Sequence, residues 1–198
     1  MNEIKARVEQ LRAQMKAHGV DAYIVPTSDF HETEYVCDHF KAREYMSGFT
    51  GSAGTCVFTA DEAKLWTDGR YFIQAAKQLE GSGIELMRMG DEGVPTIEAY
   101  LCDVLPAHAT LGFDGRVMNT AMVERLCAQL SEVTISCDMD LVGAIWHDRP
   151  ALPASKTFEL AQRYTGKSAA QKLSEVREAM AEAGADIHII TRVDDIAW

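Results

Sequence analysis

Residues 55–78, TCVFTADEAKLWTDGRYFIQAAKQ, contain two β-prone runs separated by a short polar turn, and a helix-prone run follows them. The runs at 55–59 and 64–67 are rich in β-branched and aromatic residues, and Asp61-Glu62 between them predicts a β-hairpin. An Asp-Gly pair ends the second run, and residues 70–79 are expected to form a helix. The segment therefore predicts an antiparallel strand pair with a helix packed beside it.

Strand-like and helix-like runs alternate on both sides of this segment. Further strands are expected at residues 22–25, 84–89, 110–113 and 133–137, and helices at 4–18, 96–105, 120–130 and 141–146. Strands separated by helices of about ten residues are typical of a partly parallel sheet, and the hairpin makes that sheet mixed. The sequence therefore predicts an α/β domain, a mixed β-sheet flanked by helices, over residues 1–150.

The remaining residues predict the truncated beginning of a second, related domain at 168–198. Prolines interrupt the chain after residue 149, so residues 151–167 form the predicted linker. Ser168 and Gln171 make a capping-box pattern that opens a helix, and a buried strand is expected at 187–190. One helix and one strand cannot bury their own apolar faces. We therefore expect the chain to be a fragment of a longer protein.

This second unit repeats the pattern of the first helix and strand. An offset of 165 residues aligns Gly19 with Gly184, and the same offset aligns the apolar positions of the two helices. Chance matches between amphipathic helices are common, and the alignment gains weight because the sequence stops at Trp198, just after the repeated strand.

Composition excludes several classes of protein. The formal net charge is −11 and the pI is about 4.9, which argues against sequence-independent nucleic-acid binding and against docking on an anionic membrane. No apolar run reaches the roughly 18 residues of a membrane span, and the charged N-terminus is unlike a secretory signal. The five cysteines form no paired motif, so we expect reduced thiols, most of them in the core, in a cytoplasmic protein.

Two residue clusters invite functional interpretations that we disfavour. Gly48, Gly51 and Gly54 lead into a strand and lack a Gly-Lys-Ser/Thr sequence, so we interpret them as a structural turn and not as a phosphate loop. His31, Glu34 and His39 match no metal-binding spacing, and we expect no metal site there. No serine, cysteine or carboxylate pattern completes a catalytic site, so we expect no catalytic residue in this chain.

The segment from Trp66 to Tyr71 is the best candidate for a functional surface. It places an aromatic residue at a strand end, an aspartate that could cap the next helix and Arg70 beyond it. One interpretation is purely structural, with Asp68 as an N-cap and Arg70 as a surface charge. The other is that Arg70, uncancelled by a neighbouring carboxylate, points out of the domain to receive a carboxylate or carbonyl of a ligand.

Three ordered motifs resemble one family. They are Ser28-Asp29-x-His31-x-x-Glu34-Tyr35, then Ser47-Gly48-Phe49-Thr50-Gly51-Ser52-Ala53-Gly54-Thr55, then Leu65-Trp66-Thr67-Asp68-Gly69-Arg70-Tyr71-Phe72-Ile73-Gln74-Ala75-Ala76-Lys77-Gln78. Their order and spacing are similar to the N-terminal domain of Xaa-Pro aminopeptidase (aminopeptidase P) in the creatinase/prolidase superfamily. Weaker similarity extends through Ile145-Trp146 and Asp194-Asp195, and so over nearly the whole chain.

The resemblance implies a cytoplasmic, homodimeric, three-domain metallopeptidase that removes the residue before proline. Two related N-terminal domains of ribonuclease H-like fold would precede a catalytic domain that holds two divalent metal ions, usually manganese. All five metal ligands would lie beyond residue 198, so this chain would hold no metal and would be inactive alone. By resemblance it would gate the catalytic cleft, help to position a proline-containing peptide and support dimerisation.

The same resemblance suggests substrate-binding residues and leaves two alternatives open. Arg70 is the leading candidate, Trp66 and Tyr71 would shape its surroundings, and His31 and Glu34 are weaker candidates for the wall that faces the cleft. A catalytically inactive peptide- or protein-binding module of the same fold is the first alternative. The second is the N-terminal domain of a prolidase (Xaa-Pro dipeptidase) or creatinase.

Overall fold

The structure, a computed structural model, describes residues 3–33 and 35–198. The chain divides into two compact units, Met1–Leu152 and Pro153–Trp198. The predicted helix–strand alternation lies in the first unit, and the second unit is helical with long extended segments. In the described residues, no helix is both long and apolar enough to cross a membrane.

The first unit contains one mixed six-stranded sheet in the order β4-β3-β2-β1-β5-β6. Its strands are β1 (Ala22–Pro26), β2 (Thr55–Thr59), β3 (Ala63–Thr67), β4 (Glu85–Arg88), β5 (Thr110–Phe113) and β6 (Thr134–Ser136). Only β2 runs against its neighbours, because it pairs antiparallel with both β1 and β3 while the other pairs are parallel. The predicted α/β class, the hairpin and the mixed sheet are confirmed.

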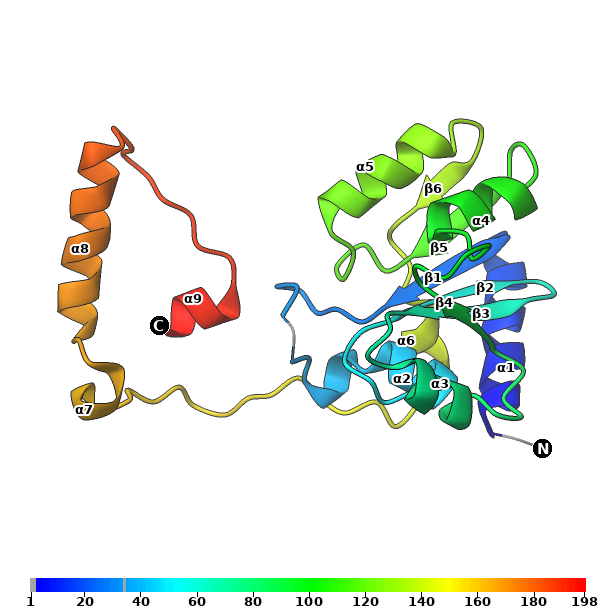
Figure 1. The fold of residues 1–198 in the computed structure, drawn as a ribbon, viewed down its shortest axis with the longest axis horizontal. Helices are drawn as coiled ribbons and strands as arrows, with labels where there is room; N and C mark the ends of the chain where they lie inside the picture. Colours follow the sequence, from blue (N-terminus) through cyan, green and yellow to red (C-terminus); the bar gives the residue numbers. More distant parts are fainter. Residues whose placement is uncertain (1–2, 34) are drawn as a thin grey trace. The chain divides into compact units, whose positions relative to one another are not determined.

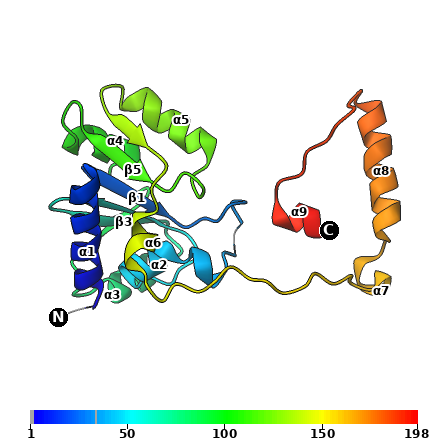
Figure 2. The same cartoon turned by 180° about the vertical axis from the view of Figure 1, so that it is seen from behind.

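Helices cover both faces of this sheet (Figure 1). One layer holds α1, α2, α3 and α6, and the other holds α4 and α5, as the opposite view also shows (Figure 2). The helices of the first unit are α1 (Glu3–His18), α2 (Ala42–Ser47), α3 (Phe72–Gln78), α4 (Ile97–Val104), α5 (Thr120–Gln129) and α6 (Leu141–Ile145), with a short 3₁₀ turn at Asp38–Phe40. The sheet is therefore buried on both sides, which explains why its central strands are apolar at consecutive positions.

Helix α1 shows how spacing decides burial. Val8, Leu11 and Met15 recur on one face of the helix, and all three are buried against the sheet. Gly19 follows the helix with a φ of 66°, the left-handed conformation that ends many helices. The predicted helix and its glycine stop are confirmed.

The glycine-rich segment after α2 is a structural turn. Gly48 has a φ of 72° and ends α2, and a Cβ on Gly51 would lie 2.3 Å from the Phe49 ring. The guanidinium of Arg43 lies beneath the turn and donates to the backbone carbonyls of Phe49 and Gly51, and to the Thr27 hydroxyl at 2.9 Å. The turn is thus held by a buried cation, and the structural interpretation of these glycines is confirmed.

The second unit contains three helices and no strand among its described residues, which are all of 153–198. They are α7 (Gln162–Thr165), α8 (Ala169–Glu182) and α9 (Val193–Ala197), and the predicted capping box of Ser168 and Gln171 is formed at the start of α8. The expected strand at 187–190 is wrong, since a strand requires a paired neighbour and no described segment pairs with these residues. That residues 168–198 begin a related domain stays a prediction.

The expectation that most cysteines lie in the core is also wrong. Only Cys56 is buried, where burial raises the pKa of its thiol to about 12. Cys37 is half-buried, whereas Cys102, Cys127 and Cys137 are exposed. The presence of a cysteine does not by itself show whether the position is buried, because burial is decided by packing in the folded domain.

A polar cluster of Glu62, Lys64 and Tyr100 predicts that the stability of the protein falls in acid. The Tyr100 hydroxyl donates to Glu62 at 2.7 Å, and this bond, together with Lys64 at 3.3 Å, lowers the pKa of the Glu62 carboxyl. A lowered folded-state pKa stabilises the protein above the ordinary value of 4.5, and that stability is lost as pH falls through the folded-state pKa.

Replacing Tyr100 by phenylalanine tests this coupling. The stability difference between wild type and Tyr100→Phe is expected to be greatest above about pH 5 and to shrink between about pH 5 and pH 3. Urea unfolding at a series of pH values measures it. A difference that stays constant over this range would show that Glu62 does not titrate through the Tyr100 bond.

Candidate functional site

Asp68, Gly69 and Arg70 form a tight turn directly after β3. The Asp68 carboxylate accepts the backbone N–H of Arg70 at 3.0 Å, and it also accepts Nε and Nη2 of the Arg70 side chain, each at 2.8 Å. Because β3 is parallel to four other strands, this turn lies at the carboxyl edge of the sheet, where open α/β sheets bind ligands. The turn presents a guanidinium of fixed orientation at that edge.

This geometry corrects two expectations. The charge of Arg70 is paired with a carboxylate, since Asp68 forms a two-point ion pair with it. The hydrogen bonds from Arg70 also lower the pKa of the Asp68 carboxyl. Asp68 is not an N-cap, since α3 begins at Phe72 and its N-cap, Tyr71, makes no side-chain cap. Asp68 instead directs its carboxylate to the backbone and the side chain of Arg70, two residues ahead.

Trp66 lies on the other side of the sheet, away from Tyr71. Its side chain is buried in the α4 layer, where the indole Nε1–H donates to the Pro95 carbonyl at 2.8 Å. Its ring packs 5.2 Å from that of Tyr100. Trp66 therefore lies in the apolar layer under α4 and does not share a surface with Tyr71, which packs on the other face of the sheet.

Tyr71, in contrast, is close to Arg70. The guanidinium carbon of Arg70 lies 5.2 Å from the centre of the Tyr71 ring. The Tyr71 hydroxyl is 2.7 Å from the Ser52 hydroxyl, and its ring meets Phe49 edge-on at 5.8 Å. The structure therefore joins Arg70 and Tyr71 with the glycine turn, as one polar and aromatic surface.

His31 lies in a separate loop after β1. Its backbone N–H donates to the Asp29 carboxylate at 2.8 Å, and its side chain is exposed. Burial raises the pKa of the Asp29 carboxyl, but hydrogen bonds from Thr33 and from the His31 backbone outweigh burial and lower it overall. Glu34, the other weak candidate, lies outside the described residues.

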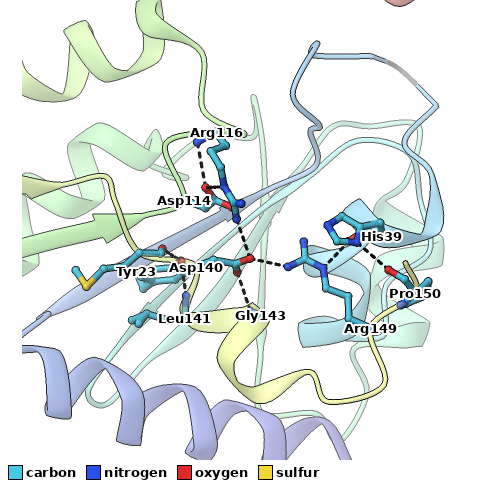
Figure 3. Close-up of polar contacts among 10 residues, drawn as sticks. Tyr23, His39, Asp114, Arg116, Asp140, Leu141, Gly143, Arg149 and Pro150 are labelled. Atoms are coloured by element: carbon cyan, nitrogen blue, oxygen red, sulfur yellow. Dashed lines mark hydrogen bonds and ion pairs between the residues drawn. The ribbon is translucent and has the colours of Figure 1, made fainter. Parts of the chain in front are cut away.

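A second turn of the same construction follows β5. Asp114 accepts the backbone N–H of Arg116 at 3.0 Å, and it accepts Nε and Nη2 of that side chain at 2.9 and 2.8 Å (Figure 3). Gly115 between them has no space for a side chain, because a Cβ would lie 2.6 Å from the Cys137 carbonyl oxygen. Sequence reasoning missed this turn, although a second Asp-Gly-Arg triplet after a predicted strand was a visible signal.

The two turns differ in what surrounds them. Arg116 also reaches Asp140, whose Oδ2 accepts its Nη2 at 3.1 Å and the Nη1 of Arg149 at 2.6 Å (Figure 3). Asp140 is in addition the N-cap of α6, and its Oδ1 accepts the N–H of Gly143 at 2.7 Å. Two carboxylates and two guanidinia thus balance within this cluster, and we assign it a structural role.

His39 belongs to this cluster. Arg149 donates from Nε to the His39 carbonyl at 2.7 Å, and the His39 Nδ1 lies 2.7 Å from the Pro150 carbonyl (Figure 3). A carbonyl can only accept, so Nδ1 is the donor. Nearby, the Tyr23 hydroxyl donates to the Met139 carbonyl at 2.6 Å and accepts from Leu141 N–H at 3.1 Å. These bonds fasten residues 139–150 to the sheet.

Across residues 3–33 and 35–198, no three His, Cys, Asp or Glu side chains come together in a way that could hold a metal ion. The residues present therefore do not fit a metal centre, and no step of metal chemistry is assigned to them.

Comparison with known proteins places this fold in a family. The profile described as Creatinase/Prolidase N-terminal domain matches residues 7–142. The chain belongs to the creatinase/prolidase N-terminal domain family. A second profile of the same description matches residues 148–198 of this family member. The resemblance inferred from the three motifs is confirmed.

The sequence relatives of this family member are much longer than the chain. Xaa-Pro aminopeptidase 1 of Dictyostelium discoideum is 38% identical over 98% of the chain and 33% of that protein. Xaa-Pro aminopeptidase ApepP of Drosophila melanogaster is 37% identical over 98% of the chain and 32% of that protein. The chain thus spans about a third of the length of the curated relatives it matches.

Two solved structures show the same fold. The X-prolyl aminopeptidase of Caenorhabditis elegans, described as a cytosolic enzyme with a di-nuclear active site, superposes with a TM-score of 0.89 at 28% identity, over 100% of this chain and 34% of that chain. The N-terminal domain of the cytoplasmic peptidase PepQ from Mycobacterium tuberculosis gives a TM-score of 0.51 at 28% identity, over 71% of this chain and 98% of that chain. The predicted fold class is confirmed.

Proposed function

We propose that this chain is the non-catalytic N-terminal part of a metal-dependent Xaa-Pro aminopeptidase. The observation that carries the proposal is the similarity of nearly the whole chain to about a third of two Xaa-Pro aminopeptidases. The described residues hold no metal-binding group, so the two metal ions of such an enzyme, manganese by resemblance, would be held by residues outside them. The chain alone would not hydrolyse peptides.

Within that enzyme, Arg70 would contact the peptide substrate. Its guanidinium uses Nε and Nη2 to pair with Asp68, so that Nη1 lies on the side away from the carboxylate, and the side chain is 65% exposed. A guanidinium held at two points loses little conformational freedom when it binds a carbonyl or a carboxylate. The Tyr71 side chain would lie beside the guanidinium, and the buried Trp66 side chain would fix the position of the end of β3.

The surface around this turn would also limit access to the catalytic cleft. His31 and Glu34 are the proposed residues of the wall that faces the cleft, and further contacts would join two copies of the protein as a homodimer in the cytoplasm. The proposed partner is a proline-containing peptide, and we expect neither nucleic acid nor membrane as a partner. The sequence downstream of residue 198 distinguishes this proposal from an inactive binding module, because only an enzyme requires the metal ligands there.

Replacing Arg70 by alanine in the intact protein tests the substrate contact. We expect kcat/KM toward Xaa-Pro peptides to fall by roughly 10- to 100-fold, since a charge-assisted hydrogen bond contributes about 1.5–3 kcal/mol. Lys77→Ala, on the exposed face of α3, is the matched control and is expected to keep the wild-type value. Wild-type kcat/KM in Arg70→Ala would refute the assignment.

A further inference from the structure

A cleft of about 480 Å³ opens next to the Asp68 turn, on the side of the sheet that faces α4 and α5. It is formed by the start of β2, the ends of β3 and β4, the segment that leads into α4, and α5. Its side walls are mainly apolar and include Trp66, Met89, Val94 and Met122. The charged side chains of Glu98 and Arg125 also line it. Its volume is within the range of known small-ligand sites.

The topology explains why a cleft forms at this place. β3 and β4 are neighbouring parallel strands, but α3 after β3 packs on one face of the sheet and α4 after β4 packs on the other. The chain therefore leaves the carboxyl edge in opposite directions from two adjacent strands, which opens a crevice between them. Such switch points are the usual ligand sites of open α/β sheets.

Three charged side chains line the cleft. Two carboxylates, Asp68 and Glu98, line it together with a single guanidinium, that of Arg125. Asp68 is engaged by Arg70 at two points, whereas in the described part of the chain the sole ion-pair partner of Glu98 is Arg125, with a long Nε to Oε1 distance of 3.5 Å. The Glu98 side chain is only 16% exposed, so it is a poorly paired carboxylate in a partly buried position.

The apolar walls suit a flexible, unbranched chain. Met89, directly after β4, is 53% exposed, and Met122 and Val94 line the same cavity. Methionine side chains adapt to slender aliphatic groups, and the methylene stem of a lysine buries well along such surfaces while its charged end reaches a polar group.

We propose that this cleft binds an aliphatic cation, of the kind presented by a lysine side chain. The methylene stem lies along Met89, Val94 and Met122, and the ammonium group meets the Glu98 carboxylate. A peptide lysine and a free alkylamine share this chemistry. The site goes beyond the proposed peptidase role and stands independently of it.

Binding to the 198-residue chain tests the proposal. The probes are acetyl-Gly-Lys-Gly-amide, the same peptide with norleucine or glutamate at the central position, and free n-butylammonium. The readout is the NMR signal of the Trp66 indole N–H, which donates to Pro95 at the cleft, while the indoles of Trp146 and Trp198 serve as internal controls. We expect a saturable shift of the Trp66 signal with the lysine peptide, roughly tenfold weaker binding of norleucine and none of glutamate.

Two variants separate the charge from the apolar wall. Glu98→Gln is nearly isosteric and is expected to reduce lysine binding roughly tenfold, to the norleucine level, whereas Met89→Ala is expected to weaken both peptides alike. Glu132→Gln, between α5 and β6 and so at the opposite edge of the sheet, is the matched control and is expected to change nothing. If butylammonium also binds, the ammonium group and the aliphatic chain are sufficient for binding. If only the lysine peptide binds, the peptide backbone also contributes. Either result supports the site.

Equal binding of lysine and norleucine would show an apolar pocket with no role for Glu98 and would overturn the proposal. An unmoved Trp66 signal with every cation would do so as well. The peptidase activity of the intact protein plays no part in these measurements, so failure here leaves the assignment of Arg70 untouched.

Discussion

Replacing Arg43 by methionine is expected to lower the free energy of unfolding of the first unit by about 3–5 kcal/mol. The Arg43 side chain is 3% exposed, and burial lowers the pKa of its guanidinium. No described carboxylate pairs with it; instead it donates to two backbone carbonyls of the glycine turn and to Thr27, and its guanidinium carbon lies 4.7 Å from the centre of the Phe49 ring. Methionine keeps much of the volume but leaves these buried acceptors without a donor.

Thermal and urea unfolding of the 198-residue chain measure the effect, which corresponds to roughly 10 °C in Tm for a unit of this size. Arg43→Lys keeps the charge but not the planar fork, so it is expected to recover only part of the loss. Arg88→Met, at a half-exposed position on β4, is the control for methionine substitution as such. A loss below about 1 kcal/mol in Arg43→Met would mean that the turn holds itself without the cation.

Replacing Gly143 by alanine is expected to destabilise the protein by about 1–3 kcal/mol, against the usual helix preference for alanine. A Cβ at this position in α6 would lie 2.6 Å from Oδ2 of Asp140 and 3.0 Å from Nη1 of Arg149. A free side chain would turn away, but Asp140 is held as the N-cap of α6 and by two arginines (Figure 3). The cost therefore depends on the Asp140 cluster.

A double-mutant cycle isolates this dependence. Asp140→Ala alone is expected to be destabilising, because it removes the cap and the carboxylate that pairs with Arg149. In that background Gly143→Ala has space for its methyl group, and we expect it to be neutral or to stabilise by up to about 1 kcal/mol. The free energies come from urea unfolding at pH 7. The same change for Gly143→Ala in both backgrounds would contradict the coupling.

Local sequence patterns were a good guide to the first unit. The runs at 55–59 and 64–67 became β2 and β3, and the helix with Val8, Leu11 and Met15 packs as its spacing predicts. Hydrophobic periodicity and turn-forming residues involve positions close in sequence, so both can be assessed without knowledge of the fold. The strand at 187–190 failed for the complementary reason, since a strand exists only with a partner that local sequence does not supply.

The candidate site was only partly predictable. The Trp-Thr-Asp-Gly-Arg-Tyr sequence indicated a turn after a strand, and the structure places that turn at the carboxyl edge of the sheet, whereas its functional role stays a prediction. That Asp68 binds Arg70 and not the next helix was not visible, because capping and local pairing use the same residue types. The cleft beside Glu98 was invisible, since its lining joins Trp66, Glu98 and Met122 from three segments that are far apart along the chain.

By itself, the sequence determined the class of the fold, the family and the turn that carries Arg70, because each depends on patterns within a few neighbouring residues. The tertiary structure decided which charges pair, which cysteines are buried and where the sheet opens into a cleft. Those outcomes depend on which strands become neighbours and to which face each following helix crosses, as β3 and β4 show. Pairing between distant segments is a property of the whole packed domain, and no short stretch of sequence contains it.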